Sequence, residues 1–200
     1  MKLILITGTP GVGKTVTCRF VKKRLKIPFI DLNQLALNKN LTLGYDKKRN
    51  CSIADFDTIS KEVLEEIRQL KSETVILDGH YAVQVVNTEM IKIAFVLRCD
   101  PNVLENRLRK RGYSERKIAE NIMAEILGVC LNDVFNYFDP KKVYQIDATK
   151  LSPLKVATKI IDKLENKTLK SEVIDWMEKI IEDGDIKLLF KYEKILSATS

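Results

Sequence analysis

The residues best suited to chemistry lie in a glycine-rich segment near the N-terminus, where positions 8–15 read GTPGVGKT. This segment matches the pattern G-x-x-x-x-G-K-[ST], in which successive backbone N–H groups form a nest for phosphate oxygens. Gly11 and Gly13 let the backbone turn tightly and approach the phosphates without a Cβ clash. Lys14 would place a positive charge on the β- and γ-phosphates, and the Thr15 hydroxyl would bind Mg²⁺. The predicted ATP-binding residues of this segment are Gly11, Val12, Gly13, Lys14, Thr15 and Val16.

A second group with chemical potential is Asp78-Gly79-His80, at the end of a short apolar run. An acid at the end of such a strand commonly contacts Mg²⁺, directly or through water, in proteins with this phosphate-binding loop. The alternative role for Asp78 is a helix cap or a turn. His80 is the only histidine of the chain. It is either structural, or it positions a water molecule or a substrate at the mouth of the same sheet.

Basic residues are concentrated between positions 98 and 117. Phosphoryl transfer develops negative charge, which guanidinium groups can stabilise. Arg107 and Arg111 are four residues apart and so share one helix face, and the break at Gly112 suits a small closing element near 110–120. The alternative is a solvated helix face. The basic residues of this stretch are Arg98, Arg107, Arg109, Lys110, Arg111, Arg116 and Lys117.

Strands that alternate with helices must position these residues. Buried parallel strands appear as continuous apolar runs, and we predict them at Leu3–Thr7, Pro28–Leu32, Thr74–Asp78, Ile91–Arg98 and Lys142–Asp147. Helical spacing and capping residues predict helices at Lys14–Leu25 and near Gln34–Leu37. A third runs from a cap at Asp55 or Asp57 to about Leu70, and a fourth from Pro101 to Lys110. The last two run from a cap at Ser114 to about Phe135 and from Ser152-Pro153 to about Leu164. Residues 33–53 are otherwise polar and irregular. The expected fold is a three-layer α/β/α domain over residues 1–165, with a mostly five-stranded parallel sheet.

The C-terminal residues 166–200 form a predicted helical extension. Within it, residues 168–196 suggest two amphipathic helices with Gly184 between them, because Ile174, Met177 and Ile181 recur at helical spacing. These helices either pack on the main domain, which we favour, or offer a surface to a partner.

Composition places further bounds on function. Of the 200 residues, 45% are apolar and 30% are charged, as in globular proteins, and no apolar run reaches the roughly 20 residues of a membrane helix. The N-terminus does not resemble a signal peptide. The four cysteines are far apart, so we expect neither a disulfide framework nor a zinc site, and a reducing compartment follows.

The formal net charge of +7 is carried by residues 1–150, because residues 151–200 hold nine basic and nine acidic residues. This excess forms either a solvated basic surface, or an anion-binding cleft or nucleic-acid-facing patch. The sequence contains no zinc finger or RNP motif.

These features together resemble the adenylate kinase isoenzyme 6 family, also called the coilin-interacting nuclear ATPase family. The resemblance covers about residues 1–150, and Val16 departs from it because a second threonine is usual there. The motifs that carry it are GTPGVGKT at 8–15, Gly44-Tyr45-Asp46, the set Cys51, Ile53, Asp55 and Asp57, the pair Asp78 and His80, Phe-Val-Leu-Arg at 95–98, Arg-Gly-Tyr at 111–113, and Asn121 with Glu125.

The resemblance implies a P-loop NTPase with the fold of nucleoside monophosphate (NMP) kinases, an NMP-binding region near 31–54 and a lid near 110–120. It places Arg111 on the ATP phosphates, Asp78 and His80 at the metal and water site, and Lys150 near the nucleotide base. Members of the family combine adenylate kinase and ATPase activity, and they assist small ribosomal subunit maturation by binding a platform ribosomal protein. Eukaryotic members are nuclear, whereas this Lys- and Ile-rich chain looks archaeal and hence cytosolic.

Two functions therefore compete. The first is a kinase that catalyses ATP + AMP ⇌ 2 ADP, or uses another NMP, with Lys14, Asp78, His80 and Arg111 as catalytic residues and with Mg²⁺ on Thr15 and Asp78. The second is an ATPase assembly factor that binds a small-subunit ribosomal protein, with RNA contact through the pre-ribosome. A purely structural ATP-binding module is a third. The loop alone would also suit a shikimate or dephospho-coenzyme A kinase, but the motifs at 51–57 and 78–80 argue against it. No membrane partner is expected.

Overall fold

The protein is built around a parallel sheet of five strands. The computed structural model describes residues 1–46, 51–165 and 171–198. In spatial order, the strands are β2 (Phe29–Asp31), β5 (Thr74–Asp78), β1 (Lys2–Thr7), β6 (Ile91–Arg98) and β7 (Val143–Asp147). Every neighbouring pair is parallel, so the predicted α/β fold with a five-stranded parallel sheet is confirmed.

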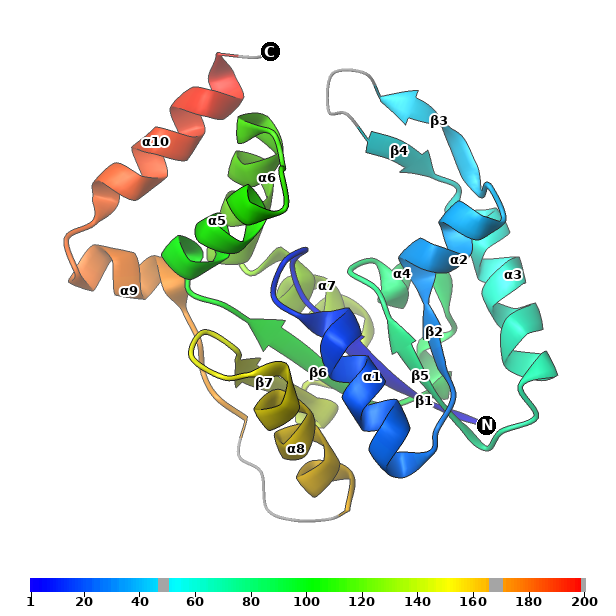
Figure 1. Ribbon diagram of the computed structural model, residues 1–200. Helices are drawn as coiled ribbons and strands as arrows, with labels where there is room; N and C mark the ends of the chain where they lie inside the picture. Colours follow the sequence, from blue (N-terminus) through cyan, green and yellow to red (C-terminus); the bar gives the residue numbers. More distant parts are fainter. Residues whose placement is uncertain (47–50, 166–170, 199–200) are drawn as a thin grey trace.

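Helices cover both faces of the sheet (Figure 1). They are α1 (Lys14–Leu25), α2 (Leu32–Asn38), α3 (Phe56–Gln69), α4 (Ala82–Val85), α5 (Pro101–Lys110), α6 (Glu115–Ile126), α7 (Val129–Tyr137), α8 (Pro153–Leu164), α9 (Trp176–Glu182) and α10 (Ile186–Ser197). Two short 3₁₀ turns lie at Thr88–Met90 and Pro140–Lys142, and β3 (Thr42–Asp46) pairs with β4 (Cys51–Ala54) in a separate antiparallel ribbon.

The core has two halves because successive side chains of a strand point to opposite faces. In β1, Ile4 and Ile6 belong to the half that also contains Cys18 and Val21 of α1 and residues of α8. Leu3 and Leu5 belong to the other half, with residues of α3 and α7. All four β1 side chains are buried, which explains why this strand appears in the sequence as an unbroken apolar run.

Two predicted features are wrong in detail. The single long helix after Ser114 is two helices: Ser114 does cap α6, but Gly128 adopts a left-handed φ of 63° and begins α7. Glycine takes this conformation without steric cost. The predicted irregular region 33–53 contains the β3–β4 ribbon, of which residues 47–50 lie outside the described residues. The predicted cap of the next helix is confirmed at Asp55, one of the two candidates, which accepts the Thr58 N–H at the start of α3.

The two C-terminal helices exist, with Gly184 between them at a left-handed φ of 70°. Residues 166–170 and 199–200 of the predicted extension lie outside the described residues. Helix α10 lies beside α6 (Figure 1). Tyr192 is fully buried there, and its hydroxyl donates to Glu105 Oε2 of α5 at 2.7 Å. The helices therefore pack on the main domain, as favoured from the sequence. Within the described ranges, no helix is both long and apolar enough to cross a bilayer.

Candidate active site

The predicted phosphate-binding loop connects β1 to α1 and is packed tightly against its neighbours. Gly8 has a φ of 138°, and a Cβ at this position would lie 2.3 Å from the Leu97 carbonyl oxygen of β6. Gly11 has a φ of 99°, and its Cβ would lie 2.8 Å from the Leu104 side chain of α5. Both positions therefore require glycine for the backbone conformation and for the close approach of other elements.

Lys14 is buried within this loop. Its Nζ donates to the Gly8 carbonyl at 2.8 Å and to the Thr9 carbonyl at 3.2 Å. The loop thus holds the ammonium group at its own centre, where an incoming phosphate would compete with two neutral carbonyls. The ammonium has three N–H donors, and its bond to an anionic phosphate would be stronger than its bonds to neutral carbonyls, so the cation is placed to turn toward an anion that enters.

A small cavity of about 120 Å³ lies over the loop. It is the space into which we expect the phosphates to enter, because the N-terminus of α1 and Lys14 both favour an anion there. The residues that line it are Pro10, Gly11, Gly13, Lys14, Thr15, Val16, Asn33, Arg111 and Tyr113.

Arg111 and Lys150, both predicted to contact ATP, lie in different settings. Arg111 follows α5 and lines the small cavity, so the structure brings it to the loop. Lys150 is exposed, follows β7 and does not line this cavity. Contact of either residue with ATP stays a prediction.

Oxygen atoms converge beside the loop. The Thr15 hydroxyl donates to Asp78 Oδ2 at 2.6 Å and lies 3.4 Å from Asp31 Oδ2. Asp31 ends β2 and stands opposite Asp78 in the parallel register. Mg²⁺ prefers oxygen ligands and is usually held by one or two carboxylates plus substrate phosphates, so this group fits the ion. Asp31 was not predicted as a ligand, although its position at the end of a predicted strand is the same signal that identified Asp78.

Asp78 is 2% exposed, and burial raises the pKa of its carboxyl to about 6, with Asp31 raising it further and Lys14 and Thr15 opposing the rise. Because the pKa is higher in the folded state, Asp78 favours folding below pH 4, and that contribution is lost as the pH rises through 6. One pKa unit corresponds to about 1.4 kcal/mol.

We therefore expect Asp78→Asn to stabilise the metal-free protein by about 2–3 kcal/mol at pH 7.5, with the gain vanishing near pH 4. Urea unfolding of both proteins at the two pH values would measure it. Asp183→Asn, at an exposed position, serves as the control and should change stability by less than about 0.5 kcal/mol. If the stabilisation of Asp78→Asn does not change with pH, the raised pKa of Asp78 is not its cause.

His80 lies close to these acids and to Lys14. Burial lowers the pKa of its imidazole to about 4, and the nearby charges of Lys14 and Lys117 lower it further. The ring is therefore neutral at pH 7. Its edge contacts the Tyr81 ring, with centroids 4.7 Å apart, and among the described residues no hydrogen-bond partner reaches its buried Nδ1. A neutral imidazole with an unused nitrogen can orient a water molecule or a substrate hydroxyl.

A second, larger cavity of about 630 Å³ lies next to the phosphate site. Pro10, Asn33 and Tyr113 line both cavities, so the two spaces adjoin. One wall comes from α2 and the start of α3, and the opposite wall comes from α6 and α7. Its volume lies in the range of small-molecule sites. Its other lining residues include Leu37, Phe56, His80, Tyr81, Gln84, Lys117, Asn121, Val129 and Asp133.

Three of the basic residues predicted to serve a lid have other partners. Arg98 is buried, 2% exposed, and Arg109 pairs with acidic side chains on α5 and α6. The Arg107 guanidinium donates to the Val12 carbonyl at 3.4 Å and to the Ala148 carbonyl at 3.0 Å. It thereby ties the phosphate-binding loop to the segment after β7. Arg98 and Arg107 therefore have partners within the fold, and the lid near 110–120 stays a prediction.

Comparisons with known proteins agree with this geometry. A protein-family profile described as an AAA domain matches residues 4–128. A relative from Methanocaldococcus jannaschii, named "Putative adenylate kinase", is 39% identical over 176 residues, which cover 88% of this chain and 93% of the relative. One with the same name from Saccharolobus solfataricus is 31% identical over 194 residues, covering 96% and 98%. The chain belongs to this adenylate-kinase-like family.

Solved structures place the adenylate-kinase-like chain in a wider fold group. A shikimate kinase from Acinetobacter baumannii matches with a TM-score of 0.58 and 17% identity, covering 85% of this chain and 96% of that one. A deoxyadenosine kinase from M. mycoides matches with a TM-score of 0.51 and 19% identity, covering 82% and 99%. At these identities the likeness establishes the fold, and the family assignment depends on the closer relatives above.

Proposed function

We propose that the chain is a nucleoside monophosphate kinase that transfers the γ-phosphoryl group of ATP to AMP. The observation that carries this proposal is the junction of the two cavities at Pro10, Asn33 and Tyr113. It sets a phosphate-sized space over the loop directly beside a space that is large enough for a nucleotide. The names of the archaeal relatives support the same reaction.

On this proposal the protein acts by position and charge, because phosphoryl transfer needs little covalent chemistry from the enzyme. Lys14 and Arg111 would hold the transferring phosphate, and Lys150 would approach the base of ATP. Mg²⁺, held by Thr15, Asp78 and Asp31, would neutralise charge on the β- and γ-phosphates. Closure of segments 31–54 and 110–120 would exclude water.

The larger cavity offers the groups that an acceptor nucleotide needs. Phe56 packs against Tyr81 with ring centroids 5.3 Å apart and gives a flat apolar wall on which a base can stack. Lys117 lines the opposite wall and supplies a cation for the acceptor phosphate. His80 also lines this cavity, and the charge of Lys14 reaches its ring.

The deciding experiment incubates the purified protein with Mg·ATP and each NMP in turn, and follows ADP, the matching NDP and free phosphate. With AMP as the acceptor, we expect each turnover to form one ADP from ATP and one ADP from AMP. The variant Lys14→Ala should form neither. Release of phosphate at a rate that no NMP alters would overturn the kinase proposal.

A second candidate is an ATPase acting in the cytosol on the maturing small ribosomal subunit, as the resemblance to the isoenzyme 6 family suggests. The neutral His80 with its unused Nδ1 favours this activity, because the ring could orient the attacking water. We expect His80→Phe to lower ATP hydrolysis without acceptor by about 10²-fold, while the midpoint of urea unfolding changes little. Wild-type hydrolysis in a folded variant would make His80 structural.

The distribution of charge also favours contact with RNA. Residues 1–30 contain seven basic residues and no acid, so the rest of the chain is balanced at 27 of each. Four of these cations surround a shallow hollow floored by Phe29, at the end of α1 remote from the loop. We call them the α1 basic surface: Arg19, Lys22, Lys23 and Lys26. None of the four forms an ion pair with any residue in the described ranges.

We expect the double variant Lys22→Glu/Lys23→Glu to weaken binding of a fluorescent 20-nucleotide RNA by at least about tenfold at 50 mM salt and to flatten the salt dependence. The matched control is Lys187→Glu/Lys194→Glu on α10, which makes the same charge change elsewhere. Equal losses in both variants would show that net charge, and not this surface, is responsible.

A further inference from the structure

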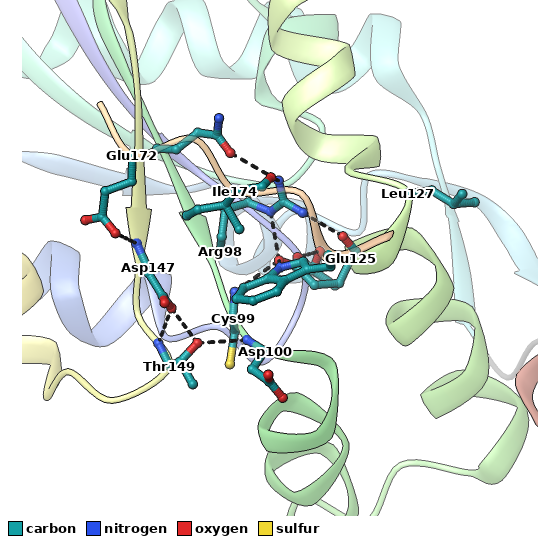
Figure 2. Close-up of polar contacts among 12 residues, drawn as sticks. Arg98, Cys99, Asp100, Glu125, Leu127, Asp147, Thr149, Glu172 and Ile174 are labelled. Carbon is teal, nitrogen blue, oxygen red and sulfur yellow. Dashed lines mark hydrogen bonds and ion pairs between the residues drawn. The ribbon is translucent and has the colours of Figure 1, made fainter. Parts of the chain in front are cut away.

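One buried carboxylate connects the phosphate-binding loop to the C-terminal segment. Glu125 of α6 is 1% exposed. Its Oε1 accepts hydrogen bonds from Arg98 Nε at 2.8 Å, the Cys99 backbone N–H at 3.0 Å and Trp176 Nε1 at 3.0 Å. Its Oε2 accepts one from the Thr9 hydroxyl at 2.5 Å. Figure 2 shows Arg98 and Cys99 grouped around Glu125.

The C-terminal side of this network is firmly attached. Arg98 also donates to the Ile174 carbonyl and to Gln145 Oε1, both at 3.2 Å. The Gln145 N–H donates to the Ser171 hydroxyl at 2.9 Å. The Asp147 N–H donates to a Glu172 carboxylate oxygen at 3.4 Å (Figure 2). Residues 171–174 therefore lie along β7 and place Trp176, which is 5% exposed, against the Glu125 carboxylate.

The loop side of the network depends on Thr9, which is 1% exposed. Its hydroxyl donates to Glu125, while its carbonyl accepts from Lys14 Nζ at 3.2 Å. One residue thus contacts both the cation that would bind phosphate and the buried carboxylate. A phosphate that draws the Lys14 ammonium toward itself would weaken its bond to the Thr9 carbonyl, and the peptide that carries the Thr9 hydroxyl could then shift.

We propose that Glu125 is a positioning residue that couples nucleotide binding at the loop to the C-terminal segment, through Thr9 on one side and Trp176 on the other. The proposal uses the ATP binding of the proposed function and adds a role for the segment after residue 170. Coupling between two sites is reciprocal. ATP therefore alters the surroundings of the indole, and a change in the contact of the indole with Glu125 alters the affinity for ATP.

Trp176 is the only tryptophan of the chain, so its fluorescence reports this contact directly. Mg·ATP is added without an acceptor, and binding is followed in parallel by calorimetry and by tryptophan emission. We expect the wild-type emission to change with the dissociation constant that calorimetry gives. In Thr9→Val, ATP should still bind, about tenfold more weakly, with most of the emission change lost. Thr17→Val, another buried threonine, in α1, is the matched control and should keep the full response.

A second variant tests the coupling from the other side. Trp176→Phe keeps an aromatic ring but removes the Nε1–H donor to Glu125. We expect the KM for ATP to rise by about three- to tenfold with kcat changed by less than about twofold, because the bond positions the loop and touches no reacting atom. Met177→Leu, the adjacent residue in α9, should leave both constants unchanged. This measurement decides the question even where Thr9→Val fails to fold.

The outcomes separate this proposal from the proposed function. Calorimetric binding of ATP with no change in Trp176 emission, or an undiminished change in Thr9→Val, would overturn the coupling alone. An unchanged KM for ATP in Trp176→Phe would also overturn it. Absence of ATP binding by calorimetry would overturn the proposed function and the coupling together.

Discussion

Lys14→Ala is expected to lower kcat/KM for phosphoryl transfer by about 10³-fold or more. The ammonium is the cation at the centre of the loop, buried, and held by the Gly8 and Thr9 carbonyls at 2.8 and 3.2 Å. In a space from which water is largely excluded, a charge aimed at the transferring phosphate stabilises the transition state far more than it would in bulk water. Initial rates of ADP formation from Mg·ATP and AMP measure the loss.

The same variant should remain folded. Removing the side chain leaves two loop carbonyls without their donor, at a cost of about 1–3 kcal/mol, while a buried charge that needed compensation disappears. Urea unfolding should therefore show a change of no more than about 2 kcal/mol. Lys22→Ala on the exposed side of the same helix controls for loss of a cation and should keep wild-type turnover. If Lys14→Ala turns over at the wild-type rate, the loop is not part of the active site.

The parts of the fold that could be predicted from sequence are those with local causes. β1, α1 and the loop between them depend on an apolar run, on glycines that adopt positive φ, and on helical spacing, all within 25 residues of the chain. The phosphate site follows from the same segment. Gly128 shows where local evidence was present but insufficient. Apolar spacing continues through it from α6 into α7, and the left-handed turn that separates the helices is visible only in the backbone.

The roles that sequence reasoning did not assign have causes distant along the chain, and Glu125 entered the sequence analysis only as part of a motif that carries the resemblance. Glu125 lies on an amphipathic helix, where a glutamate ordinarily faces solvent, and its four donors come from positions 9, 98, 99 and 176. Asp31 becomes a candidate ligand only because β2 pairs with β5 and sets it opposite Asp78. Arg98 carries a charge that suits phosphate, but a partner 27 residues away buries it. Strand order and helix packing decide these contacts, and no short pattern encodes them.

Arg98→Met should destabilise the protein by about 3–5 kcal/mol, the range for breaking a buried ion pair by removing one partner. Arg98 and Glu125 are 2% and 1% exposed, and Arg98 Nε lies 2.8 Å from Glu125 Oε1. Loss of the guanidinium leaves the Glu125 carboxylate in the core without its cation and releases the Ile174 carbonyl of the C-terminal segment. The free energy of unfolding in urea at pH 7 measures the effect.

Two further variants test whether the loss of stability in Arg98→Met comes from the unpaired Glu125 carboxylate or from the loss of any positive charge. Arg109→Met removes a guanidinium that also pairs with acids but is 40% exposed, so it should lower the free energy of unfolding far less than Arg98→Met does. Arg98→Met combined with Glu125→Leu removes both buried charges and should recover stability relative to Arg98→Met alone, because the penalty lies in the uncompensated carboxylate. If the double variant is instead less stable than Arg98→Met, the hydrogen bonds that Glu125 accepts from Thr9 of the loop and from Trp176 outweigh the penalty of the unpaired carboxylate. Glu125 would then stabilise the fold chiefly by joining the loop, β6 and the C-terminal segment.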